Sequence, residues 1–154
     1  MSSESIPAHK VILASNSSIR KKILEDAGIT FEVIASKVDE EELKKSFSSK
    51  NFKDYCLALA KAKALDVSNK KKNAYVIGSD QICCYEDEIF SKPLTKESCF
   101  KTLSKLSGNT HYQNCGISIC KDGKEIWSHY AQAALTMKLL SDLEIKDYID
   151  KDEP

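Results

Sequence analysis

No apolar run in this 154-residue sequence approaches the roughly 18 to 20 residues that are needed to cross a bilayer. The first residues also lack the charged segment and following apolar segment of a signal peptide. Glycine and proline are scarce, with five and three residues, and the content of 30% charged and 42% hydrophobic residues is that of ordinary globular proteins. These features exclude fibrous, collagenous and disordered classes. We expect a soluble, cytoplasmic protein with one domain and a sizeable core.

Net charge is absent as well, because 23 lysines and arginines balance 23 aspartates and glutamates. This balance argues against a broad nucleic-acid surface, which normally has net basic charge or a basic stripe. The three histidines are scattered without metal-ligand spacing, and the six cysteines include no C-x-x-C pair. We therefore predict reduced thiols in the core rather than disulfides or a zinc site.

The most informative stretch runs from Ala74 to Pro93. An apolar run of strand length breaks at Gly78, and a lone carboxylate, Asp80, follows two residues later. A carboxylate is rarely removed from water unless it is paired, hydrogen-bonded or bound to a metal. Ligands of open α/β sheets also collect beyond the carboxyl ends of the strands. Asp80 is therefore the first candidate for chemistry.

A strand, a polar loop and a helix form the opening unit of the chain. The pattern predicts a strand over Val11–Ala14 and a helix over Ile19–Ala27 that ends at Gly28. The loop offers hydroxyls and unpaired backbone N–H groups that can bind a phosphate. The alternative is that Ser17 or Ser18 only caps the helix.

A helix predicted over about Phe52–Leu65 directs one lysine inward. At about 100° per residue, Lys61 points away from the apolar stripe, whose members are Phe52, Cys56, Leu59 and Lys63. Lys63 can extend along the edge of the core or place its ammonium in a site beyond the sheet. The acidic run Asp39–Glu42 is typical of a solvated helix start.

The remaining chain alternates between strands and helices and contains no internal repeat. Thr95 is a credible N-cap for a helix over Lys96–Leu106, and Ser141 and Glu144 have capping-box spacing for a helix through Ile149. Strands are expected over Ile29–Ala35, Ala74–Tyr85 with a return arm at Ile89–Phe90, His111–Cys120, Glu125–Tyr130 and Ala133–Leu139. This order predicts an α/β fold with a mixed sheet.

Five islands of sequence together resemble the Maf family of nucleoside triphosphate pyrophosphatases, and the similarity spans Val11 to Pro154. In chain order they are Leu13–Ser17 with Arg20, Asp39–Glu40, Ala60–Ala64, Gly78–Gln81, and Lys92–Leu94 with Leu106–Gly108. The resemblance implies a Maf or inosine-triphosphatase-like α/β fold, in which helices flank a twisted mixed sheet and a cleft separates two lobes. Residues 1–154 would form a single Maf-like domain that lacks the C-terminal part of the family's domain.

The family hydrolyses a nucleoside triphosphate between its α and β phosphates and releases a monophosphate and pyrophosphate. The resemblance implies that a divalent cation, Mg²⁺ or Mn²⁺, is held by oxygen ligands from Glu40 and Asp80. The residue that matches Asp80 is also assigned as the base that activates water, and both roles stay open here. A homodimer is implied as well. By this resemblance the catalytic residues are Asp80, Glu40, Lys63 and Lys92, and the substrate-binding residues are Ser15, Ser17, Ile19, Arg20 and Gln81.

Two departures from the common family pattern resemble the branch that prefers 7-methyl-GTP. Gln81 stands where many members have threonine, and Ile19 stands where many have arginine. At Ile19 a guanidinium is lost, and at Gln81 an amide is gained that both donates and accepts hydrogen bonds. These two changes favour a methylated guanine nucleotide over dTTP or UTP. The alternatives are a pyrophosphatase that prefers dTTP or UTP, and a nucleotide-binding regulator of septum formation without catalysis.

Overall fold

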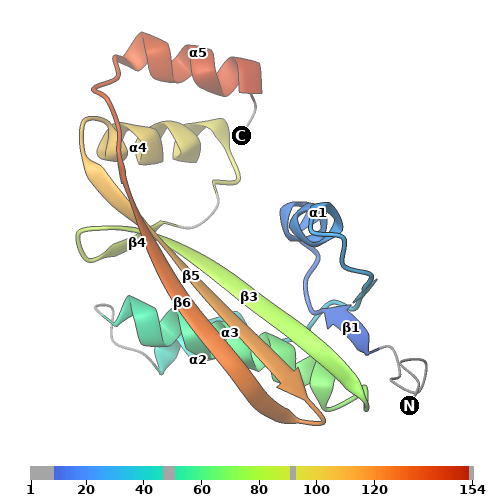
Figure 1. The fold of residues 1–154 in the computed structure, drawn as a ribbon. Coiled ribbons are helices and arrows are strands. Elements are labelled where there is room, and N and C mark those ends of the chain that lie inside the picture. Colours follow the sequence, from blue (N-terminus) through green and yellow to red (C-terminus); the bar gives the residue numbers. More distant parts are fainter. Residues whose placement is uncertain (1–8, 47–50, 91–92, 153–154) are drawn as a thin grey trace. The chain divides into compact units, whose positions relative to one another are not determined.

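The computed structural model describes residues 9–46, 51–90 and 93–152, and over these residues the fold is mixed α/β (Figure 1). A six-stranded sheet is accompanied by helices, as predicted. The strands are β1 Lys10–Leu13, β2 Glu32–Val33, β3 Ala74–Tyr85, β4 Glu88–Phe90, β5 Thr110–Lys121 and β6 Lys124–Thr136. The helices are α1 Ser18–Asp26, α2 Glu40–Lys45, α3 Phe52–Ser68, α4 Lys96–Leu106 and α5 Asp142–Asp152.

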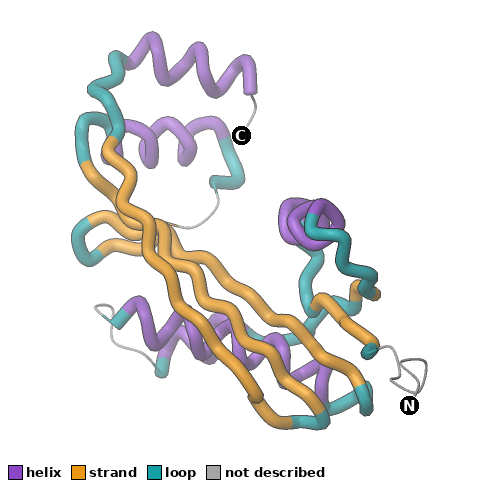
Figure 2. The backbone as a smooth tube through the Cα atoms, in the orientation of Figure 1, coloured by secondary structure: helices purple, strands orange, loops and turns teal. Residues whose placement is uncertain are grey.

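The sheet contains both parallel and antiparallel pairs. Its strand order is β2-β1-β3-β5-β6, and β4 pairs with β3 as the second arm of a hairpin (Figure 2). β1 is parallel to both β2 and β3, and Leu13 stands opposite Ile77. β1 therefore ends beside the middle of β3, three residues before Asp80, whereas β3 continues to Tyr85.

The chain divides into two compact units. The first comprises residues 1–80 and 115–130, and the second comprises 81–114 and 131–154. β3, β5 and β6 contribute residues to both units. This division matches the two lobes implied by the sequence, whereas the cleft between them stays a prediction.

The core of the first unit forms where α3 packs on the sheet. Small residues allow this close approach, because a Cβ at Gly78 would overlap the carbonyl oxygen of Ala60. All six cysteines are free thiols; four of them are buried as predicted, whereas Cys83 and Cys115 are half-buried. The buried cluster consists of Ile12, Ala14, Ala64, Val67, Ala74, Val76 and Cys120.

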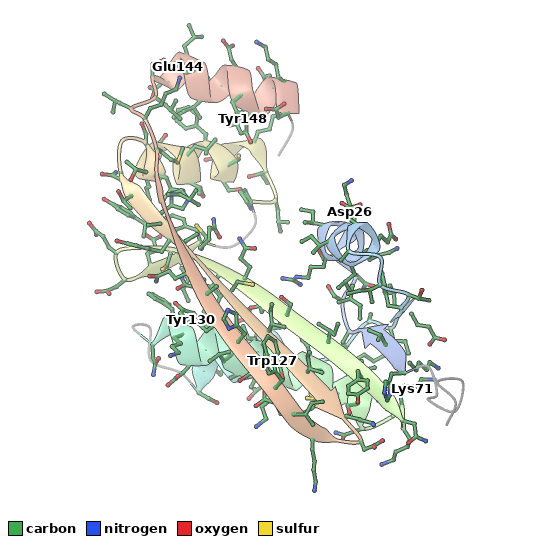
Figure 3. The ribbon with its side chains drawn as sticks, viewed as in Figure 1. Asp26, Lys71, Trp127, Tyr130, Glu144 and Tyr148 are labelled. Carbon is green, nitrogen blue, oxygen red and sulfur yellow. The ribbon has the colours of Figure 1, made fainter. Side chains whose placement is uncertain are left out.

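The second unit has its own core between α4 and α5, which contact each other. Thr95 caps α4. Ser141 and Glu144 exchange the two hydrogen bonds of a capping box before α5, and Figure 3 labels Glu144 at the start of this helix. The core of this pair is formed by Cys99, Ile145 and Ile149, with Phe100, Leu103 and Leu140 packed against it.

Two predicted strands differ from the structure. The expected strand over Ile29–Ala35 is only two residues long, because just Ile12 and Leu13 of the short β1 pair with it. The separate strand predicted over Ala133–Leu139 is wrong, since β6 continues without a break to Thr136. Pairing with the long β5 keeps these residues extended despite their weak local preference for strand structure.

In the part of the chain that the structure describes, no helix is long and apolar enough to cross a membrane.

Candidate active site

Lys63 lies between two carboxylates, Glu40 at the start of α2 and Asp80 in the middle of β3. Its Nζ is 2.9 Å from Oε1 of Glu40 and 3.0 Å from Oδ1 of Asp80. The Lys63 and Asp80 side chains are only 13% and 14% exposed, whereas Glu40 is 54% exposed. The inward lysine of α3 therefore directs its ammonium at Asp80 rather than into solvent, and Lys61 is exposed as the helical period predicts.

The acidic run supplies the second carboxylate from a short helix. Glu40 is the first residue of α2, and Asp39 caps this helix by accepting a hydrogen bond from the Glu42 N–H at 3.2 Å. α2 contacts α3, which carries Lys63. The run is thus a helix start, as predicted, and it also fixes one carboxylate beside the inward lysine.

Burial and neighbouring charges shift the pKa values of this group. Burial raises the pKa of Asp80 above its ordinary value, and the charge of Glu40 adds to the rise, although Lys63 and Arg20 oppose it. For Lys63, burial lowers the pKa, but the two carboxylates together outweigh burial and the net shift is upward. The two residues therefore differ in their charge environment. Two carboxylates stabilise the charged form of Lys63, whereas Asp80 shares the positive charge of Lys63 with Glu40. An ionised carboxylate with a raised pKa is a better proton acceptor.

The start of α1 brings a second cation toward the same group. The Arg20 guanidinium donates from Nη1 to Oγ of Ser15 at 3.3 Å, and the charge of Arg20 lowers the pKa values of both Asp80 and Cys56. Ser15 is buried two residues after β1 and also accepts from the Ser17 N–H at 3.0 Å. Ser15 therefore orients Arg20 and shapes the loop.

Ser17 is the N-cap of α1, and its hydroxyl accepts from the Arg20 N–H at 3.3 Å. Of the two interpretations of this loop, the capping one describes Ser17 in the structure. Its phosphate contact stays a prediction.

For three other predicted substrate or catalytic residues, no contact with this cluster is described. Ile19 is 72% exposed on α1, and no described contact joins it to the ionic group. Gln81 is exposed, belongs to the second unit, and donates from Nε2 to Oε1 of Gln113 at 2.8 Å. Lys92 lies outside the described residues, so its predicted role has no structural counterpart here.

Sequence reasoning did not single out two buried neighbours of Asp80. The thiol of Cys56 is fully buried and donates to the main-chain oxygen of Asp80 at 3.2 Å. Tyr55 is also buried, and burial together with the charges of Asp80 and Glu40 raises its pKa. The helical stripe shared by Cys56 and Lys63 was a usable signal for Cys56, whereas no pattern marked Tyr55.

The carboxylates fit a cation that is shared with a substrate better than a closed metal cage. Within the described ranges, no group of three or more His, Cys, Asp and Glu side chains is arranged to hold a metal ion. Glu40 and Asp80 each direct one oxygen at Lys63, and each carboxylate has a second oxygen. Mg²⁺ is commonly bound by one or two carboxylates together with substrate phosphates and waters, so this donor set suits it.

Comparison with known proteins identifies the family. The family described as Maf-like protein matches residues 10–154. The chain belongs to this family. It is 37% identical over 144 residues to a nucleoside triphosphate pyrophosphatase of Legionella pneumophila (strain Paris), covering 94% of this chain and 72% of that protein. It is 39% identical over 144 residues to a 7-methyl-GTP pyrophosphatase of Brucella abortus, covering 92% and 72%.

Among solved structures, a HAM1 protein from Coxiella burnetii is similar with a TM-score of 0.47 and 11% identity over 82% of this chain and 71% of that chain.

Four of the sequence islands shared with the Maf-like family meet in the first unit of this chain. They supply the loop after β1, the start of α2, the inward face of α3 and the middle of β3. The charged groups that they bring together are Arg20, Glu40, Lys63 and Asp80. Residues distant in sequence thus form one compact ionic cluster.

Proposed function

We propose that this member of the Maf-like family is a nucleoside triphosphate pyrophosphatase. It hydrolyses the bond between the α and β phosphates and releases a nucleoside monophosphate and pyrophosphate. The observation that carries this proposal is the buried contact of Lys63 with Asp80, with Glu40 as the second carboxylate. The names of the Legionella and Brucella relatives support the same reaction.

Asp80 is the proposed proton acceptor. Water attacks phosphorus, the bond from phosphorus to the bridging oxygen breaks, and the bridging oxygen leaves on the other product. The proton lost by the attacking water passes to the Asp80 carboxylate, whose raised pKa suits this transfer. Lys63 keeps the carboxylate in place through the 3.0 Å contact with Oδ1.

The cations of the site face a substrate with several negative charges. Arg20 and Lys63 offset the charge of the phosphates, and Ser15 holds the Arg20 guanidinium in orientation. Glu40 and Asp80 would hold a divalent cation, Mg²⁺ or Mn²⁺, which would supply further charge compensation at the phosphates when bound. We assign Lys92 to the same phosphate contacts from the sequence pattern alone.

We further propose that 7-methyl-GTP is the preferred nucleotide. The Nε2 of Gln81 donates to Gln113, which orients the Gln81 amide and makes its Oε1 available to accept a hydrogen bond. Guanine offers N–H donors to such an acceptor, and exposed Ile19 adds no charge that would repel the cationic methylated ring. The Brucella relative named 7-methyl-GTP pyrophosphatase supports this preference, while the name of the Legionella relative is general.

One experiment tests the reaction and the base preference together. Pyrophosphate release is measured from 7-methyl-GTP, GTP, dTTP and UTP in the presence of Mg²⁺, with nucleotide binding measured in parallel. We expect the highest kcat/KM for 7-methyl-GTP. Preference for dTTP or UTP would overturn the base assignment, and tight binding with no turnover would favour the septum regulator over the enzyme.

A further inference from the structure

The helix that carries Lys63 lies directly on the strands beside Asp80. A Cβ at Gly78 would lie 2.7 Å from the Ala64 nitrogen, and a Cβ at Gly116 would lie 2.8 Å from the Cys56 carbonyl oxygen. Such distances leave no room for a side chain, so α3 meets β3 and β5 backbone to backbone. The position of Asp80 relative to Lys63 therefore depends on this contact between helix and strands.

Cys56 is one of the side chains that form a hydrogen bond within this contact. It is fully buried, and its Sγ donates to the main-chain oxygen of Asp80 at 3.2 Å. The Gly116 main-chain N–H forms a hydrogen bond to the same sulfur. One thiol thus connects α3 to β3 through a donated bond and to β5 through an accepted bond.

The Cys56 thiol is fully enclosed by the protein, and its sulfur is hydrogen-bonded to the main chain. A cysteine buried in this way is chemically inert. Its hydrogen bond to Asp80 is therefore the property that bears on the proposed reaction.

We propose that Cys56 is a positioning residue, which holds the main chain of Asp80 on α3 while Lys63 holds the Asp80 carboxylate. The inference rests on the proposed role of Asp80 in phosphate-bond hydrolysis. Cys56 and Lys63 project from the same stripe of one helix, so the two attachments fix Asp80 at its main chain and at its side chain. Because Cys56 holds the main chain in addition, the Asp80 carboxylate keeps a constant distance from the attacking water.

Cys120 provides a matched control for simple packing. It is equally buried, faces the same helix, and belongs to the cluster that contains Ala64 and Val67. Its sulfur lies 3.8 Å from the Ser118 hydroxyl, so its described hydrogen-bond contact is remote from Asp80. If Cys56 only fills space, Cys56→Ala and Cys120→Ala should have similar effects.

The first test compares kcat and KM for Cys56→Ala, Cys56→Ser and Cys120→Ala on the best of the four nucleotides. We expect Cys56→Ala to lower kcat about tenfold and to leave KM within about twofold, since it disturbs the reacting carboxylate rather than binding. Cys56→Ser should retain kcat within about threefold because its hydroxyl donates the same bond. Equal losses in Cys56→Ala and Cys120→Ala, or no rescue by serine, would overturn the proposal.

A second measurement needs no substrate. The infrared S–H stretching band that disappears in Cys56→Ser reports on the Cys56 thiol alone. We expect this band at a lower frequency than that of a thiol without a hydrogen bond, and a band at the free-thiol position would overturn the proposal.

The two proposals fail in different ways. Active wild-type protein with inactive Asp80→Asn and unaffected Cys56 variants would remove only the positioning role. Wild-type protein that hydrolyses none of the four nucleotides would remove the proposed function, and the positioning role with it.

Discussion

The ammonium of Lys63 lies 3.0 Å from Oδ1 of Asp80 and joins the inward face of α3 to β3, across 17 positions of sequence. Both side chains are largely buried. A buried ion pair adds little net stability, because the cost of removing two charges from water offsets their attraction. The pair therefore supports the proposed roles of the two residues, phosphate binding by Lys63 and proton transfer at Asp80.

Lys63→Met should lower kcat/KM by at least about 100-fold, because it removes a cation from the phosphates and leaves Asp80 beside Glu40 without their shared counterion. Lys61→Met is the control, since Lys61 lies on the same helix and is exposed. It should stay within about twofold of wild type. Pyrophosphate release measures both variants, and equal losses would contradict the assigned role of Lys63.

Asp80→Asn should abolish turnover and retain the fold, as measured by pyrophosphate release and circular dichroism. Asp26→Asn, at an exposed residue of α1 paired with Lys22, serves as the control and should keep full activity. Substantial turnover by Asp80→Asn would remove Asp80 from the role of base.

The same variant tests the pKa of Asp80 without substrate or metal. The pKa of Asp80 in the folded state is raised above the ordinary value of 3.8. In the pH window between 3.8 and this raised pKa, the folded protein therefore binds more protons than the unfolded protein. The free energy of unfolding of wild type, relative to Asp80→Asn, should therefore fall as the pH rises through this window. Urea unfolding in EDTA at several pH values measures this difference. A relative stability that rises with pH would mean that the Lys63 pairing outweighs burial.

Local signals in the sequence were sufficient for several elements of the fold. α4 covers the predicted residues Lys96–Leu106, because the Thr95 cap fixes its start and Ser107-Gly108 provides its end. The inward direction of Lys63 followed from the helical period alone. In both cases the decisive interactions lie within one helix.

Non-local contacts determined what the sequence could not. The length of β6 depends on its pairing with β5, so the break expected after Tyr130 does not occur. The contact of the Cys56 thiol with the Asp80 carbonyl spans 24 positions and requires the close approach of α3 at Gly116. A single sequence contains the residue types for such contacts but not their pairing in space.

The proposed cation gives Glu40 a testable role. Glu40→Gln should raise the Mg²⁺ concentration needed for half-maximal activity by about tenfold, because one anionic ligand is lost. Glu41→Gln is the neighbouring control and should leave the Mg²⁺ dependence within about twofold, since surface changes away from a site have small effects. A titration of activity against Mg²⁺ after EDTA treatment measures both variants. Full activity in excess EDTA would contradict the requirement for a divalent cation.

The alkaline stability of the protein should report on Cys56. Its pKa rises from an ordinary 9.0 to about 12 in the folded state, so unfolded protein loses this proton first as the pH rises. The free energy of unfolding of wild type relative to Cys56→Ser should therefore fall above pH 9, by at most about 1.4 kcal/mol per pH unit. Denaturant unfolding between pH 8 and pH 11 measures this slope, because serine does not ionise in that range. Parallel stability curves for the two proteins would show that Cys56 ionises as readily when folded as when unfolded, and would contradict its burial against Asp80.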